Sequence, residues 1–127
     1  MISDRYKNDG VSTLQLSKDQ VGIRDQIKQK VDSSHYKFEK IKVCPICTKC
    51  DFEVLSEKDR YGLVCNIVVC KDCGLISTNP RMDQESYIEF YNLEQKKLYV
   101  GENKPSNLYF ERQVYKGKEI YDHLDFN

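Results

Sequence analysis

The feature that most constrains this chain is the grouping of its six cysteines, which all lie between residues 44 and 73 of 127. Four of them form two C-x-x-C pairs, Cys44 with Cys47 and Cys70 with Cys73, and 22 residues separate the pairs. This spacing is typical of a zinc ribbon, in which two tight turns present four thiolates to one metal ion. The intervening residues are enough for a hairpin that brings the two turns together.

The residues inside and after the pairs fit this interpretation. Pro45 stiffens the first turn, and Gly74 can adopt a positive φ that lets backbone N–H groups turn toward the sulfurs. Four thiolates fill the tetrahedral shell of Zn²⁺ and leave no position for a reacting water, so the predicted zinc is structural. Such a site can contribute about 10–16 kcal/mol of apparent folding free energy, which a chain with 39% hydrophobic residues needs.

One alternative ligand set stays open, because Cys50 forms a third C-x-x-C pair with Cys47 and can replace Cys44. We favour Cys44, since Pro45 lies inside that pair. Cys65 falls in an apolar segment and is expected in the core. The two histidines are expected outside the ligand shell, because four paired cysteines already complete it. A redox-active dithiol protein is a further hypothesis for the function, although neither pair has the α/β context of a thioredoxin-like motif.

Composition and charge narrow the functional classes. No apolar run approaches the ~20 residues that cross a bilayer, and the N-terminus lacks the apolar stretch of a secretory signal, so we expect a cytoplasmic protein. The 20 basic and 20 acidic residues balance, but residues 44–79 hold four bases and five acids. With four thiolates on one Zn²⁺, this segment would carry a charge of about −3, a poor surface for a phosphate backbone.

The pattern along the chain predicts an α+β fold, with a small three-stranded zinc ribbon flanked by helices. Residues 1–16 show no periodicity and are expected to be loose. Ser17 and Gln20 form a capping box before a helix whose apolar stripe includes Ile23, Ile27 and Val31. Strands are expected around residues 52–54, 63–69 and 75–76, with a polar turn over 56–60 and the 63–69 strand buried.

The C-terminal part changes to a helical period. Asp83 can cap a helix that contains four apolar or aromatic residues, Tyr87, Ile88, Phe90 and Tyr91. Residues 93–106 are expected to form a long connection, and Asn107 can cap a last helix with one apolar face. We therefore divide the chain into an N-terminal extension with a helix (1–43), a zinc ribbon (44–79) and a helical lead-in or linker (80–127).

The region from residue 44 to about residue 124 also resembles a known family, the zinc-ribbon leader region of bacterial class I S-adenosylmethionine-dependent methyltransferases. Many members look like enzymes of surface-polysaccharide or nucleotide-sugar pathways. The matching stretches are Cys44-Pro45-Ile46-Cys47, Cys70-Lys71-Asp72-Cys73-Gly74-Leu75, Asn79-Pro80-Arg81, and residues 87–91, 98–105 and 110–117.

The resemblance implies a substrate-recognition or docking module that is not catalytic alone. The chain has no glycine-rich S-adenosylmethionine motif, no phosphate loop and no G-x-S-x-G or H-E-x-x-H motif, so we expect no catalytic site in it. Its expected partner is a catalytic methyltransferase domain, joined in cis if the chain is a fragment or acting in trans. The alternative is a free-standing zinc-ribbon module that binds protein or nucleic acid.

Overall fold

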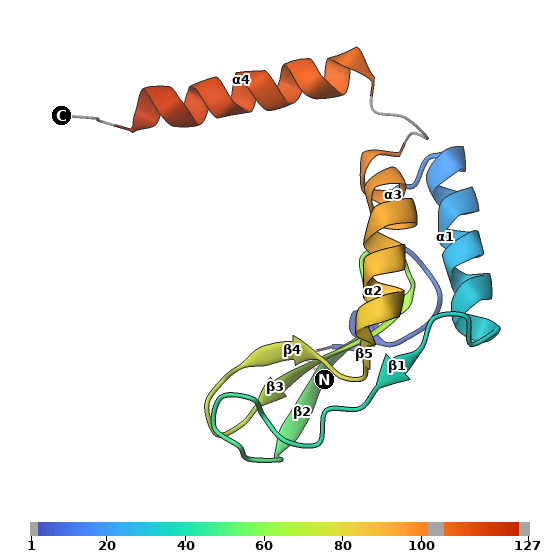
Figure 1. The fold of residues 1–127 in the computed structure, drawn as a ribbon, viewed down its shortest axis with the longest axis vertical. Coiled ribbons are helices and arrows are strands. Elements are labelled where there is room, and N and C mark those ends of the chain that lie inside the picture. The colour runs from blue at the N-terminus through green and yellow to red at the C-terminus, as the bar shows by residue number, and fades with distance from the viewer. Residues whose placement is uncertain (1–2, 102–105, 125–127) are drawn as a thin grey trace.

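A computed structural model describes residues 3–101 and 106–124 of the chain (Figure 1). It contains helices and two small antiparallel sheets, with the sheets at one end, a pair of helical columns beside them, and α4 projecting away. The elements in chain order are η1 Asp4–Tyr6, α1 Lys18–Asp32, β1 Phe38–Glu39, β2 Phe52–Lys58, β3 Val64–Cys70, β4 Ile76–Thr78, β5 Arg81–Met82, α2 Gln84–Phe90, the π-helix η2 Tyr91–Gln95, α3 Lys96–Val100 and α4 Asn107–His123.

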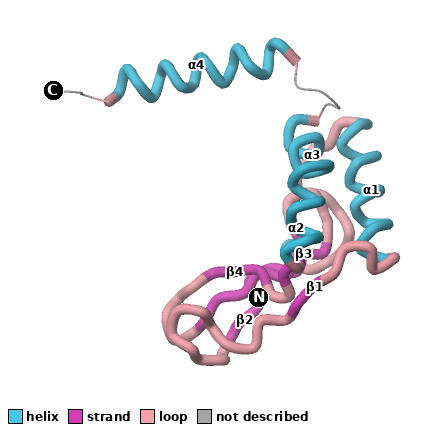
Figure 2. The backbone as a smooth tube through the Cα atoms, in the orientation of Figure 1, coloured by secondary structure: helices cyan, strands magenta, loops and turns pink. Residues whose placement is uncertain are grey.

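The expected three-stranded sheet is confirmed. It is antiparallel and consists of β2, β3 and β4, with β3 in the centre (Figure 2). The third strand follows the second cysteine pair as predicted. The prediction that the strand at 63–69 is fully buried was wrong: Val68 is buried, but Val64 is 59% exposed. Only Val68 and Cys70 of β3 are buried, so burial is confined to the second half of the strand.

Residues 56–60 were predicted to be a turn, but β2 continues through Lys58. Ser56 and Lys58 are both buried because the N-terminal segment covers them. The Lys58 ammonium donates to Asp9 Oδ1 at 2.5 Å and to the Val11 carbonyl at 3.0 Å. A polar strand is stable here because its buried polar groups have partners.

The same contacts correct the expectation that residues 1–16 are loose. The N-terminal segment from residue 3 runs along the β2–β3 hairpin, and the Thr13 N–H donates to the Arg60 carbonyl at 3.0 Å. The Ser12 hydroxyl donates to the same carbonyl at 2.9 Å. These bonds are formed by irregular backbone, which has no periodicity for a sequence pattern to reveal.

The helical part has its core between α1 and the α2–α3 column (Figure 1). The predicted capping box of Ser17 and Gln20 is present at the start of α1. The predicted stripe faces inward, with Ile23 and Ile27 buried. The core cluster draws on α1, the segment after it, the β2–β3 turn and α3, and consists of Ile23, Ile27, Tyr36, Tyr61 and Leu98.

A two-stranded ribbon of β1 and β5 joins the sheet to the helices. The Asn79 side chain accepts from the Ile41 N–H at 2.9 Å and donates to the Ile41 carbonyl at 2.9 Å. The Asp83 side chain caps α2, as predicted, through the Ser86 N–H at 2.9 Å. These bonds bring the arm before Cys44 back against the segment that leaves the sheet.

The expected connection over residues 93–106 was wrong in its first half. The chain stays helical through η2 and α3 as far as Val100, because Glu94 and Leu98 are buried against α1. Pro105, part of the same expectation, lies outside the described residues. Ser106, not Asn107, caps α4 by accepting from the Tyr109 N–H at 3.2 Å.

Helix α4 differs from the other α-helices because none of its residues is buried. Its apolar residues are exposed, with Phe110 at 53% and Val114 at 72%. It projects from the end of the α2–α3 column in Figure 1. Among the described residues, no helix combines the length and the apolar character that a membrane crossing requires.

Candidate metal centre

The four cysteines predicted as ligands lie together at the end of the three-stranded sheet. Their Sγ atoms all lie within 4.8 Å of one another. Two close separations each join one pair to the other: Cys44 to Cys73 at 3.6 Å and Cys47 to Cys70 at 3.5 Å. Thiols that are 23 and 29 residues apart in the chain therefore form a single cluster.

The spacing of these sulfurs fits a metal ion and does not fit disulfides. A tetrahedral zinc site with Zn–S bonds of about 2.3 Å requires sulfur–sulfur distances of about 3.8 Å. A disulfide requires about 2.05 Å, and all six cysteines are free thiols. The donor set is all sulfur, which suits zinc better than magnesium or calcium, since those ions prefer oxygen.

The first cysteine turn is closed by two backbone hydrogen bonds. The Thr48 N–H donates to the Cys44 carbonyl at 2.9 Å, and the Cys44 N–H donates to the Lys49 carbonyl at 2.7 Å. Thr48 has a left-handed backbone with φ of 60°, which reverses the chain immediately after Cys47. This conformation is costly for a β-branched residue.

The second turn repeats this arrangement at the equivalent positions. The Gly74 N–H donates to the Cys70 carbonyl at 2.8 Å, and the Cys70 N–H donates to the Leu75 carbonyl at 2.9 Å. Gly74 has a φ of 76°, as predicted from its place after the second pair. Each turn thus presents two sulfurs from the same backbone geometry, although the sequences of the turns differ.

Backbone N–H groups point at the sulfurs and shift their acidity. The N–H groups of Cys47 and Ile46 lower the pKa of the Cys44 thiol to about 7, against the effect of burial. The Lys49 N–H acts in the same direction on Cys47, but burial and hydrogen bonds with the neighbouring thiols, Cys70 first, outweigh it. Together they raise the pKa of Cys47 to about 12. The neighbouring thiols therefore favour the thiolate at Cys44 and oppose it at Cys47. A bound cation would allow all four thiolates to coexist.

The cluster is anchored in the sheet on one side and reaches the surface on the other. Cys44 and Cys70 are fully buried, whereas Cys73 is exposed. The Lys71 N–H donates to the Asp51 carbonyl at 3.0 Å, and the two side chains form an ion pair at 3.1 Å. The turn between β3 and β4 is therefore tied to the start of β2, which holds the sulfurs in place.

The remaining candidate ligands lie outside the cluster. Cys50 is exposed, and the group of four contains Cys44 in its place. Cys65 is half-buried in β3, where burial raises the pKa of its thiol. His35 Nε2 lies 2.9 Å from Glu89 Oε1, and His123 Nδ1 lies 3.0 Å from a carbonyl of its own helix.

A second polar cluster, centred on Glu94, was not predicted from the sequence. Its two carboxylate oxygens are engaged by different groups: Lys30 Nζ lies 2.7 Å from Oε1, and the Tyr36 hydroxyl donates to Oε2 at 2.6 Å. Lys30 also pairs with Glu89 at 3.0 Å. The carboxylates of Glu94 and Glu89 raise the pKa of Lys30 despite its partial burial.

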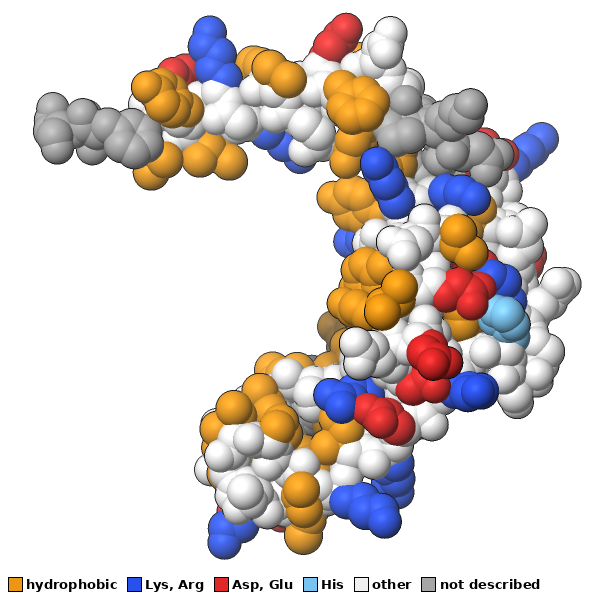
Figure 3. Space-filling model, viewed as in Figure 1, with side chains coloured by type: hydrophobic (Ala, Val, Ile, Leu, Met, Phe, Trp, Pro, Cys, Tyr) orange, Lys and Arg blue, Asp and Glu red, His pale blue; other side chains and the backbone are white. Residues whose placement is uncertain are grey.

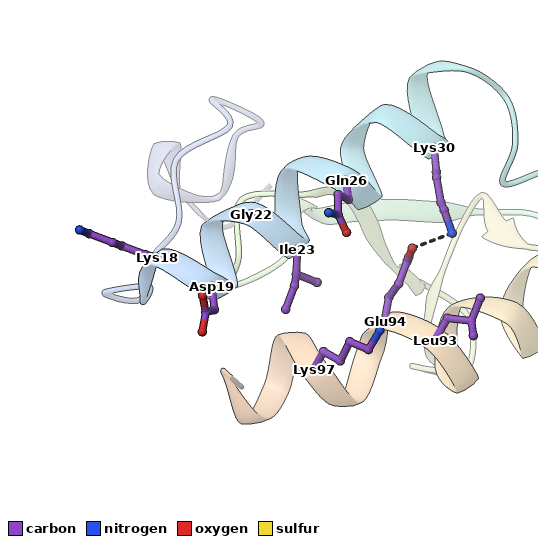
Figure 4. Close-up of a pocket in the computed structure, with 9 residues that line it drawn as sticks. All are labelled: Lys18, Asp19, Gly22, Ile23, Gln26, Lys30, Leu93, Glu94 and Lys97. Carbon is purple, nitrogen blue, oxygen red and sulfur yellow. Dashed lines mark ion pairs between the residues drawn. The ribbon is translucent and has the colours of Figure 1, made fainter. Parts of the chain in front are cut away.

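This cluster lines a shallow hollow of about 450 Å³ between α1 and the η2–α3 segment (Figure 4). The Lys30–Glu94 pair closes one end of the hollow, and both charges are already neutralised. Among the described residues, every buried side-chain nitrogen or oxygen has a hydrogen-bond partner. The cluster therefore serves to hold α1 against the π-helix. No sequence signal indicated it, because Glu94 stands in a polar stretch that resembles a linker.

Comparison with known proteins adds no further constraint: no protein-family model, no curated protein and no solved structure matches this chain.

Proposed function

We propose that Cys44, Cys47, Cys70 and Cys73 hold one structural Zn²⁺ ion, so that the protein is a zinc-ribbon module. The observation that carries this proposal is the convergence of four sulfurs, within 4.8 Å of one another, from two turns of equivalent backbone geometry. With all four positions taken by sulfur, the ion has no site for a substrate and acts as a cross-link. It would join the segment before β2 to the β3–β4 turn.

Zinc content of the purified chain tests this proposal, with two variants beside the wild type. One zinc per chain is expected in the wild type and in Cys50→Ser, and Cys70→Ser is expected to lose the ion. Zinc retained in Cys70→Ser, or lost in Cys50→Ser, would show that the ligand set is different. A folded wild-type protein with six titratable thiols and no zinc would overturn the proposal.

We further propose that this module serves an S-adenosylmethionine-dependent methyltransferase as its substrate-recognition or docking part. The resemblance in sequence supports this role, and the exposed aromatic residues of α2 and η2 offer a surface for it (Figure 3). The rings of Tyr87 and Tyr91 lie 4.3 Å apart, and their side chains are 50% and 46% exposed. A paired aromatic surface of this kind is typical of a docking face.

The contacts of the basic residues weigh against the nucleic-acid alternative. Three of the four bases in residues 44–79 are already engaged within the chain. Lys58 pairs with Asp9, Lys71 pairs with Asp51, and the Arg60 guanidinium lies over the Tyr61 ring at 5.0 Å from its centre. A surface that binds a phosphate backbone presents several free cations instead.

The docking role is tested by retention of a cofactor-binding polypeptide. The immobilised chain is incubated with an extract of its own cells and radiolabelled S-adenosylmethionine, and ultraviolet cross-linking then labels any methyltransferase that is retained. We expect a labelled polypeptide with the wild type and its loss with Tyr87→Ala/Tyr91→Ala, while Tyr115→Ala on α4 retains it. Salt-sensitive retention of RNA without a labelled polypeptide would favour the alternative function.

A further inference from the structure

Helix α4 carries an apolar stripe that is largely exposed to solvent. Its members fall at alternating spacings of four and three residues, which is the a/d pattern of a coiled coil. At 100° per residue they lie within an arc of about 80°. The stripe consists of Phe110, Val114, Gly117 and Tyr121 in the helix and Leu124 at its C-cap, and its four side chains beyond Cα are each at least 52% exposed.

Gly117 lies in the middle of this helix, where no contact within the described chain requires a glycine. A glycine in a helix interior costs about 1 kcal/mol relative to alanine. A Cβ added at Gly117 would meet no atom within 4 Å, so nothing in the described chain requires its small size. Close approach of a second helix is the common reason for a glycine at such a position.

The charged residues beside the stripe are complementary to those of a second copy of the same helix. Glu111 and Lys118 stand seven residues apart on the same flank of the stripe, at e positions of the heptad. Neither forms an ion pair with another described residue. In an antiparallel pair of helices, e positions of one helix face e positions of the other, so Glu111 of each copy would face Lys118 of the other copy.

We propose that two copies of this chain associate through α4 as an antiparallel helical pair. In this register Phe110 faces Tyr121 of the second copy, and Val114 faces Gly117, so a large side chain meets a large one and a small side chain meets the glycine. The two-fold axis passes through the middle of the helix, so every contact occurs twice. The helix of 17 residues spans about 26 Å, so the antiparallel arrangement separates the N-terminal ends of the two helices by about that length.

Sedimentation equilibrium of the full chain over a range of concentrations tests the pairing. The wild type is expected to change from monomer to dimer as its concentration rises. Val114→Asp is expected to remain monomeric, and the matched control Tyr115→Asp, which places the same charge on the opposite face, is expected to dimerise. Helix content measured by circular dichroism should be the same in both variants, because no residue of α4 is buried in the chain.

Charge exchange tests the antiparallel register. Glu111→Lys and Lys118→Glu should each raise the dimer dissociation constant about tenfold, because each places like charges opposite one another twice. The double variant should restore wild-type dimerisation, and an equimolar mixture of the two single variants should form a heterodimer. A wild type that stays monomeric at every concentration would overturn the proposal, and a dimer indifferent to both charge variants would exclude this register.

Discussion

Thr48 and Gly74 occupy the same place in the two cysteine turns, one residue after each C-x-x-C pair, and both have left-handed backbones with φ of 60° and 76°. Each donates its N–H to the carbonyl of the first cysteine of its pair, at 2.9 and 2.8 Å. The two turns thus impose the same conformation on two residues of very different conformational freedom.

This equivalence predicts that substitutions at the two positions have unequal effects on stability. Gly74→Ala should lower the free energy of unfolding by about 1–2 kcal/mol, because a Cβ there meets no neighbouring atom but strains the left-handed backbone. Thr48→Gly should change it by less than about 1 kcal/mol, since relief of strain is offset by greater freedom of the unfolded chain. Urea denaturation of both zinc-loaded variants measures the difference. Equal losses would contradict the equivalence of the turns.

Removal of the proposed metal ion is expected to loosen the cysteine end of the sheet and to leave the helical core intact. The core cluster of α1, Tyr36, Tyr61 and Leu98 contains no cysteine, so its packing does not depend on the ion. After chelation, hydrogen exchange at the Thr48 and Gly74 amides should speed up by about 100-fold, while the amides of α1 keep their protection. Loss of protection throughout α1 would show instead that the protein folds as one metal-dependent unit.

Alkaline pH is expected to weaken the contact between Tyr36 and Glu94. Burial, followed by the hydrogen bond to Glu94, raises the pKa of Tyr36 to about 12. Because the folded pKa is above that of the unfolded chain, this contribution to stability is complete below pH of about 10 and is lost as the pH rises toward 12. Unfolding of wild type and Tyr36→Phe by urea at several pH values measures it.

The Tyr36→Phe variant should be less stable than the wild type by about 1–3 kcal/mol at neutral pH, because one oxygen of the buried Glu94 loses its donor. The gap should narrow above pH of about 10. Tyr115→Phe, at a position 68% exposed, serves as the control and should follow the wild type throughout. A stability difference between the two proteins that stays constant up to pH of about 12 would contradict the hydrogen bond from the Tyr36 hydroxyl to Glu94.

Contact between the N-terminal segment and the β2–β3 turn depends on Gly62. A Cβ at this position would lie 2.8 Å from the Gly10 carbonyl oxygen and 2.9 Å from the Ser12 nitrogen, and Gly62 also has a φ of 82°. Gly62→Ala should therefore lower the free energy of unfolding by more than about 2 kcal/mol. Gly22→Ala in α1, where nothing lies within 4 Å, should raise it by about 0.5–1 kcal/mol. Thermal unfolding of the two variants measures the difference in stability. Equal effects would contradict the close approach of Gly62 to the N-terminal segment.

The features that the sequence by itself determined are local. Spacing of the cysteines, the positive φ of Gly74, the capping box at Ser17 and the Asp83 cap all follow from residues within a few positions of one another. The three-stranded sheet follows from three short runs with the pattern of strands, two between the cysteine pairs and one after the second pair. Each of these depends on short-range hydrogen bonding or backbone preference, which the residue type alone sets.

Only the tertiary structure decided the features that depend on distant partners. β2 continues through the polar Ser56 and Lys58 because the N-terminal segment supplies their hydrogen bonds. The chain stays helical through Glu94 because Lys30 and Tyr36, which are 64 and 58 residues away, neutralise and bond its buried carboxylate. Polar residues of this kind have the same local pattern in a loop as in a buried element, and what distinguishes the two is the partner that the fold brings to them.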